Sequence, residues 1–212
     1  MNQNRKIAVL GGGGRTGKYL ITKLIDKGYF VKILLRDPEK FEIKSSLIQI
    51  IQGDAIEGSI IRSLIHGCDA VISTIGQRKG EQLIAEQATR NVLDAMLQFG
   101  IERYILVAGI NIDTPFDNKG PETVIATNWM KTNFPLIQED RQKAYKLLVK
   151  SDIKWTLVRV PFIYFNNGDG NVDINLNDCL GNKIYADNIA WFLVKQLTDD
   201  TYINKAPFIY NS

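Results

Sequence analysis

Four consecutive glycines, at positions 11–14, limit what this chain can fold into more than any other feature. They lie in the stretch VLGGGGRTGKYL, residues 9–20, between an apolar run and a helix-like run. Glycine loses more conformational freedom on folding than any other residue. Four in a row therefore predict either a flexible turn or a loop whose backbone must approach another group closely. The surrounding residues distinguish the two.

Apolar runs and stretches with helical spacing alternate along the chain. Strands are predicted at 6–11, 29–37, 46–54, 68–76, 102–109 and 154–161, and helices at 16–28, 57–67, 80–100, 136–152 and 186–199. The segment 110–135 reads as irregular, and the last apolar run is 206–211. This order predicts an α/β protein with a doubly wound, mainly parallel sheet, a Rossmann-like fold. The helix at 80–100 covers the sheet or pairs with another subunit, so an oligomer stays open.

Length and charge narrow the class of protein. The 212 residues predict a single domain, 1–212, with a small substrate-pocket region from 110–135 and 161–185. The net charge of +3 comes from interspersed charges, so no nucleic-acid partner is expected. No apolar run approaches the roughly 18 residues of a membrane span, and the first residues do not resemble a signal peptide. We therefore expect a cytoplasmic protein without a membrane partner.

Few residues suit a metal site. The chain has two cysteines and one histidine, none with metal-ligand spacing, so no metal is expected. Cys68 and Cys179 are predicted to be small buried hydrophobic residues. His66 precedes a glycine at a predicted helix end, where a capping role is favoured over catalysis.

The glycine loop has the spacing of a nucleotide-binding loop. Gly11, Gly14 and Gly17 fit GxxGxxG, and Gly12, Gly14 and Gly17 fit GxGxxG, between the first strand and the first helix. In this position glycines permit a tight turn, backbone approach to a diphosphate and close helix packing. The free N–H groups of the helix start then meet phosphate oxygens. A P-loop is excluded because Tyr19 follows the lysine, where a serine or threonine is needed.

Residues at the other predicted strand ends indicate which nucleotide is bound. Thr16 is expected to cap the first helix. Arg36 ends the second strand, ahead of Asp37, and Arg15 can converge with it on a 2′-phosphate, which favours NADP(H) over NAD(H). The alternative is that both arginines are solvated surface charges. Weaker candidates for cofactor contacts follow the third and fourth strands: Asp54, Ala55, Thr74, Ile75 and Gly76.

Six motifs in this order resemble the atypical short-chain dehydrogenase/reductase family: VLGGGGRTG, LLRDPEK, QGDA, DAVISTIG, SDIKWTLVRVP and IYADNIAWFLV. The nearest branch is its NAD(P)H-binding, NmrA-like group, which includes flavin reductases. The resemblance covers roughly residues 5–210 and implies NADP laid across the strand ends. It implies cofactor contacts from the glycine loop and the later strand ends: Gly11, Gly13, Gly14, Arg15, Thr16, Gly17, Arg36, Asp54, Ala55, Thr74, Ile75, Gly76, Ala108, Pro161 and Phe162.

The chain departs from this family in its proton-transfer residues. Many members use a Tyr-x-x-x-Lys pair, in which the lysine lowers the tyrosine pKa. Here Glu139 stands four residues before Lys143, and Tyr145 is followed by Val149. The serine frequent after the fifth strand is replaced by Ala108. Catalytic residues are therefore unassigned; Lys143 and Tyr145 are weak candidates, interpreted as solvated helix residues.

Three functions fit these residues. The first is an NADPH-dependent reductase of a flavin, quinone or similar planar acceptor, by direct hydride transfer. The second is a non-catalytic NADP-sensing regulator of the NmrA type, favoured by the missing pair. The third, a nucleotide-sugar epimerase or dehydratase, needs a tyrosine base and a larger carboxyl-terminal domain. Aromatic residues of the later loops either stack on an acceptor or form the core of a folded-over loop: Phe116, Trp129, Phe134 and 162–167.

Overall fold

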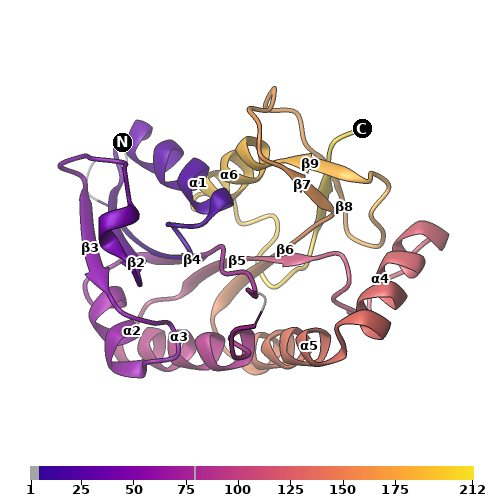
Figure 1. Cartoon of the computed structure of the whole chain (residues 1–212), viewed down its shortest axis with the longest axis horizontal. Coiled ribbons are helices and arrows are strands. Elements are labelled where there is room, and N and C mark those ends of the chain that lie inside the picture. Colours follow the sequence, from indigo (N-terminus) through magenta and orange to yellow (C-terminus); the bar gives the residue numbers. More distant parts are fainter. Residues whose placement is uncertain (1–4, 79) are drawn as a thin grey trace.

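The computed structural model describes residues 5–78 and 80–212 and places a parallel sheet between two layers of helices (Figure 1). The strands are β1 (Lys6–Leu10), β2 (Phe30–Leu35), β3 (Ile48–Gln52), β4 (Ala70–Ser73), β5 (Arg103–Gly109), β6 (Lys154–Val160), β7 (Phe162–Tyr164), β8 (Asp173–Asn175), β9 (Lys183–Tyr185) and β10 (Phe208–Tyr210). The helices are α1 (Arg15–Asp26), α2 (Gly58–Ile65), α3 (Ala85–Phe99), α4 (Pro121–Asn133), α5 (Pro135–Lys150) and α6 (Ala186–Lys195), with a 3₁₀ turn at Pro38–Lys40.

The order of the strands confirms the predicted architecture. Within the described residues the main sheet runs β3-β2-β1-β4-β5-β6-β10-β8. The pairs from β3 to β10 are parallel, and β8 joins β10 antiparallel at the edge. The chain winds outward in one direction from β1 and in the other from β4. This reversal makes the carboxyl ends of β1 and β4 the place where such sheets bind ligands.

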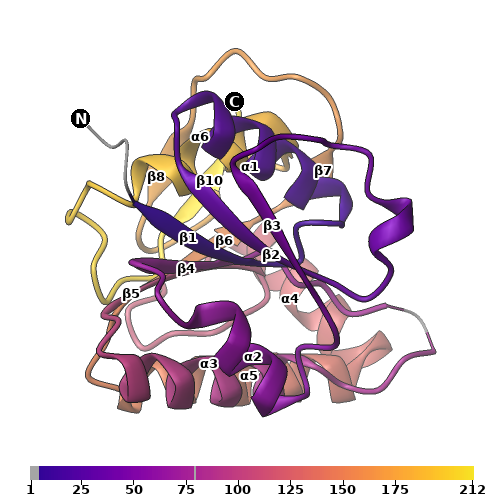
Figure 2. The same ribbon diagram turned by 90° about the vertical axis from the view of Figure 1, so that its left-hand side faces the viewer.

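Alternate residues of each strand feed two separate cores. Ile7 and Val9 of β1 pack on the side of α1 and α6, and Ala8 and Leu10 pack on the side of α2, α3 and α5. This follows from the two-residue period of a strand, and it explains why the central strands are apolar throughout. Figure 2 shows α1 and α6 on one face of the twisted sheet and α2, α3 and α5 on the other. The apolar side of α3 is thus buried within this chain.

The segment expected to be irregular contains a helix. Residues Pro121–Asn133 form α4, and Pro121 and Pro135 each begin a helix, because proline is tolerated in the first turn. The spacing of apolar residues does not indicate α4, because this helix buries Thr123 and Thr127 and exposes Ile125. Among the aromatic residues of this region, Phe116, Trp129 and Phe134 are also exposed, so they do not form the core of a folded-over loop.

Two helix starts also differ from the predictions. The first helix begins at Arg15 after the N-cap residue Gly14, so Thr16 lies inside the first turn and is not the cap. The helix expected from residue 80 begins at Ala85. The Asp140 carboxylate of α5 accepts hydrogen bonds from the backbone amides of Ala85 (2.8 Å) and Glu86 (3.0 Å). Because this cap comes from 55 residues away, the local sequence does not reveal where α3 starts.

Other predictions near the core hold. Cys68 and Cys179 are free and buried. His66 follows α2 as its C-cap residue, its ring lies edge-on to Phe99, and its carbonyl accepts a hydrogen bond from Lys32. The last apolar run forms β10. The later loops contribute β7 and β9, which form a separate two-stranded parallel sheet.

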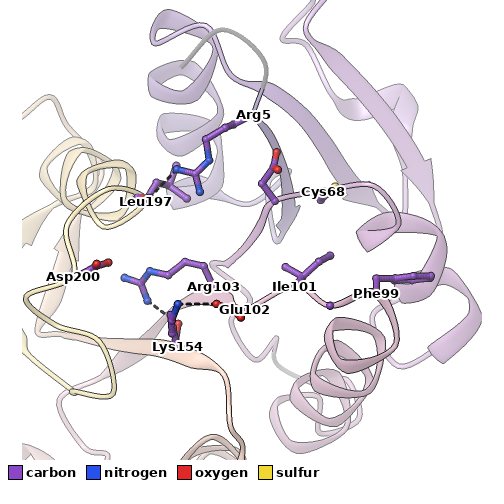
Figure 3. A pocket seen from close by; sticks show the side chains of 11 residues that line it. Arg5, Cys68, Phe99, Ile101, Glu102, Arg103, Lys154, Leu197 and Asp200 are labelled. Carbon is purple, nitrogen blue, oxygen red and sulfur yellow. Dashed lines mark hydrogen bonds and ion pairs between the residues drawn. The ribbon is translucent and has the colours of Figure 1, made fainter. Parts of the chain in front are cut away.

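Two arginines hold the carboxyl end of α6 against the amino ends of the central strands. Arg103 donates from Nε and Nη2 to the Gln196 carbonyl (3.0 and 2.9 Å) and from Nη1 to the Lys154 carbonyl (2.9 Å). Arg5 donates to the Leu197 carbonyl at 2.9 Å. A pocket of about 410 Å³ lies between these side chains (Figure 3). Guanidinium groups here satisfy carbonyls left unpaired at a helix end, which carry partial negative charge.

We predict that replacing Arg103 by Met lowers the free energy of unfolding by about 2–3 kcal/mol, because the buried Gln196 carbonyl and the partly buried Lys154 carbonyl lose these donors. Burial lowers the pKa of Arg103 to about 10, and the negative charges of Asp200 and Asp199 act in the opposite direction. The charged guanidinium is stabilised mainly by its hydrogen bonds to the two carbonyls. Urea denaturation measures the change. Lys154→Met is the control: it removes only an exposed ion pair with Glu102 and should leave the urea midpoint nearly unchanged. Equal midpoints for the two variants would contradict the role given to Arg103.

Candidate functional site

The glycine loop forms the floor of a cleft at the carboxyl ends of β1, β2 and β4. Gly11 has φ +79°, and a Cβ there would lie 2.7 Å from the Thr74 carbonyl carbon. A Cβ on Gly17 would lie 2.1 Å from the Gly11 carbonyl oxygen. The start of α1 therefore rests directly on the turn, and a side chain at either position would separate them. The Thr74 hydroxyl donates to the Gly11 carbonyl (3.2 Å), which ties β4 to the loop.

Several backbone N–H groups of this loop have no acceptor. Within the described residues, the amides of Gly13, Arg15 and Thr16 make no hydrogen bond, and the first turn of α1 holds no acidic residue. Such donors at a helix N-terminus form a binding site for an anion. The residues therefore fit a diphosphate group, because its oxygens supply the acceptors that the loop lacks.

Most of the predicted cofactor residues line one cleft of about 560 Å³. Those that line it are Gly11, Gly13, Gly14, Arg15, Thr16, Arg36, Asp54, Ala55, Thr74, Ile75 and Gly76. Gly17 lies beneath the loop, and Ala108 lines a smaller neighbouring cavity. Pro161 and Phe162 are not among the lining residues, and the Phe162 side chain is exposed on β7.

Among the lining residues that were not predicted to contact the cofactor, two come from loops and lie beside the predicted arginines. Phe165, after β7, lies under Arg15, with the guanidinium carbon 3.9 Å from the ring centroid. Glu81, in the segment after β4, lies opposite Arg36. Neither belongs to a motif, so their position depends on how distant loops fold together. The aromatic run at 162–167 was the one available signal for Phe165.

Arg36 is bound by carboxylates in this structure. Its Nη1 and Nη2 donate to the two carboxylate oxygens of Glu81 at 2.7 and 3.1 Å, and Asp54 lies 3.8 Å from Nη1. The hydrogen bond from Arg36 holds the pKa of Glu81 below its usual range, and the same bond raises the pKa of Arg36. Asp54 also accepts the Ile56 amide in a local turn (3.2 Å). The arginine predicted to meet a phosphate therefore already holds an anionic group.

The weak catalytic candidates lie apart from each other. Lys143 is exposed and pairs with Glu139 at 2.9 Å on the surface of α5. Tyr145, expected to be solvated, is buried and packs edge-to-face against Trp155. Burial raises the pKa of Tyr145, opposed by Arg159 and assisted by Asp117. A tyrosine base needs a lowered pKa, so this environment does not reproduce the Tyr-x-x-x-Lys arrangement.

A small cavity beside the cleft contains an unpaired cation. The cavity shares Ile75 with the cleft and is lined by Ala108, Tyr145 and Arg141, among others. Burial lowers the pKa of Arg141, opposed by Asp140. Arg141 makes no hydrogen bond or ion pair with the part of the chain that the structure describes, since the Asp140 carboxylate caps α3. This cavity thus offers a positive group at the carboxyl end of β5.

Residues 5–78 and 80–212 contain neither a cluster of metal ligands nor a helix that could span a membrane. No group of three His, Cys, Asp or Glu side chains there is placed to hold a metal ion. Nor do the helices of this part include one of the length and apolar character that a bilayer span requires.

Residues 11–200 match a family model described as NAD(P)H-binding. An uncharacterized chloroplastic protein of Arabidopsis thaliana is 28% identical over 215 residues, which cover 96% of this chain and 74% of the relative. Cinnamoyl-CoA reductase 1 of Petunia hybrida is 27% identical over 141 residues, or 60% of this chain and 42% of the enzyme. The match thus spans under half of that enzyme's length.

Solved structures share the whole fold at low identity. A short-chain dehydrogenase/reductase of Veillonella parvula, in complex with NADP, superimposes with a TM-score of 0.80 at 14% identity, covering 98% of this chain and 94% of the other. The anaerobilin reductase ChuY of Escherichia coli O157:H7 gives 0.80 at 17% identity, covering 97% and 96%. Together with the unsatisfied loop amides and the family match over residues 11–200, this shows that the chain belongs to the NAD(P)H-binding family of Rossmann-like proteins.

Proposed function

We propose that this protein is an NADPH-dependent reductase of a planar acceptor such as a flavin or quinone. The observation that carries the proposal is the cleft itself: free loop amides lie beside two guanidinium groups, Arg15 and Arg36, at the switch point of the sheet. When bound, NADPH supplies the hydride, and the acceptor takes its proton from water. The cytoplasmic location stays a prediction, because one relative is a chloroplastic protein.

The protein's own part in this reaction is binding and orientation. The amides of Gly13, Arg15 and Thr16 would hold the diphosphate, and Arg36 would hold the 2′-phosphate by two parallel hydrogen bonds. The cavity beside Ile75, with Ala108 and Arg141, adjoins the proposed place for the acceptor; at about 50 Å³ it has room for only part of a planar ring system. Its small, mostly apolar lining would exclude water from one face of the reacting rings.

A second function is favoured by the absence of a proton-transfer pair. Lys143 is committed to Glu139 on the surface, and Tyr145 is buried with a raised pKa. An NADP-sensing regulator needs cofactor binding but no such pair. Purified protein with NADPH and a panel of flavins, quinones and dyes discriminates the two, because only the reductase oxidises NADPH when an acceptor is added.

The loop predicts a selective effect of Gly14→Val. A side chain there occupies space next to the free amides, where its Cβ meets only the Gly11 carbonyl oxygen at 3.1 Å, so the fold should persist. We expect the NADPH Kd to rise at least about tenfold, equivalent to about 1.4 kcal/mol. Fluorescence titration measures it, and Gly58→Ala on α2, where a Cβ has ordinary contacts, is the control. Unchanged binding in Gly14→Val would argue against this loop as the phosphate site.

Direct hydride transfer predicts that the helix residues are dispensable. Tyr145→Phe and Lys143→Met should each retain kcat within about threefold, whereas loss of a general acid or base costs about 10²–10⁴-fold. Steady-state NADPH oxidation with the best acceptor gives kcat and KM for both variants. A hundredfold fall in kcat for Tyr145→Phe, with NADPH binding intact, would instead assign proton transfer to that hydroxyl.

The preference for NADP(H) predicts a differential effect of Arg36→Gln. The variant loses the group proposed to pair with the 2′-phosphate, so we expect NADPH affinity to fall about tenfold and NADH affinity to change little. Parallel titrations with the two cofactors measure the ratio. Lys40→Gln, an exposed cation lining the same cleft and paired with Asp37, tests whether any lost positive charge gives the same result. An unaltered ratio in Arg36→Gln would remove the basis for preferring NADP(H).

A further inference from the structure

We propose that Glu81 occupies the 2′-phosphate position of the cofactor-free protein and is a specificity-determining residue that NADP(H) must displace and NAD(H) need not. This inference rests on the proposed function, since it takes Arg36 as the phosphate-binding side chain. It begins from the pairing of Arg36 Nη1 and Nη2 with both Glu81 oxygens.

The pairing uses the atoms that a phosphate would need. A guanidinium group offers two parallel N–H donors, which match a carboxylate and a phosphate equally well. Both donors of Arg36 on this edge are engaged, at 2.7 and 3.1 Å. A phosphate can bind Arg36 in this geometry only when the Glu81 carboxylate leaves. Both side chains are 39% exposed and line the cleft, so the exchange takes place at its open edge.

Three charged groups around Glu81 determine the free-energy cost of this exchange. Arg78 Nη1 lies 3.7 Å from Glu81 Oε1, so displacing the carboxylate frees a second guanidinium as well as Arg36 for the incoming phosphate. Asp54, 3.8 Å from Arg36, is a negative charge that opposes the phosphate and limits the net positive charge of the pocket. Hydrogen bonding to Arg36 lowers the pKa of Glu81, so its carboxylate is ionised at neutral pH.

The segment that carries Glu81 has its own support. The Gln77 side-chain amide donates to the backbone carbonyls of Arg78, Glu81 and Gln82 at 3.1, 3.0 and 3.0 Å. These bonds hold the backbone near Arg36 independently of the ion pair. The Glu81 side chain can therefore rotate away while its backbone stays, and a cofactor without a 2′-phosphate leaves the pair intact.

The test compares two nucleotides that differ only in the 2′-phosphate. Titration calorimetry with 2′,5′-ADP and with 5′-AMP is carried out on the full chain, on Glu81→Gln, on Arg36→Gln and on the double variant. We expect Glu81→Gln to tighten 2′,5′-ADP about 3- to 5-fold, the upper end for an exposed ion pair. The affinity for 5′-AMP should stay within about twofold. In the Arg36→Gln background, Glu81→Gln should give no further gain, because the two residues act through one contact.

A matched control separates this contact from a general loss of negative charge. Glu86, five residues later, pairs with Arg90 at 3.0 Å and does not line the cleft, so Glu86→Gln should leave both affinities unchanged. Equal tightening of 5′-AMP and 2′,5′-ADP in Glu81→Gln, or the same gain in Glu86→Gln, would overturn the inference. So would no gain in Glu81→Gln while Arg36→Gln still weakens 2′,5′-ADP; the proposed cofactor preference would then survive alone. If Arg36→Gln leaves 2′,5′-ADP binding unchanged, the cofactor preference itself fails, and the inference fails with it.

Discussion

The contact between Gly17 and Gly11 determines the geometry of this molecule's cleft. With a would-be Cβ only 2.1 Å from the Gly11 oxygen, α1 can sit against the end of β1 only when position 17 carries no side chain. That close approach aims the first turn of α1 at the ends of β2 and β4 and leaves the amides of Arg15 and Thr16 without an acceptor among the described residues. Ordering four glycines costs conformational entropy, and the loop that results is a site for an anionic ligand.

Sequence reasoning identified what depends on local pattern. Alternating apolar runs predicted β1 to β6 and most helices. The glycine spacing and the predicted strand ends together predicted about half of the residues that line the cleft. It failed where distant parts of the chain decide. The start of α3 depends on Asp140, α4 has no apolar face to detect, and the positions of Glu81 and Phe165 depend on loops that carry no motif. Tyr145 was misplaced because helical spacing alone does not show which face of α5 meets Trp155.

The cleft and the cavity beside it differ in chemical character. The cleft is rich in backbone donors and in charged side chains that already pair with one another. The cavity is mostly apolar and is lined by Arg141, which has no partner among the described residues. Withdrawing a cation even partly from water without giving it a partner is costly. An acceptor that carries an acidic group would relieve that cost, and a neutral acceptor would not. The two compartments meet at Ile75, between the end of β4 and the start of the segment that carries Glu81.

The Asp140 cap makes α3 and α5 a single unit for protein engineering. Because one carboxylate of α5 begins α3, residues 110–152 cannot be replaced independently of the first half of the chain. A chimaera that imports this region from a relative keeps the start of α3 only when the incoming helix places an acceptor oxygen at position 140. Thus α5 limits which substrate-side segments can be exchanged, although none of its residues lines the nucleotide cleft.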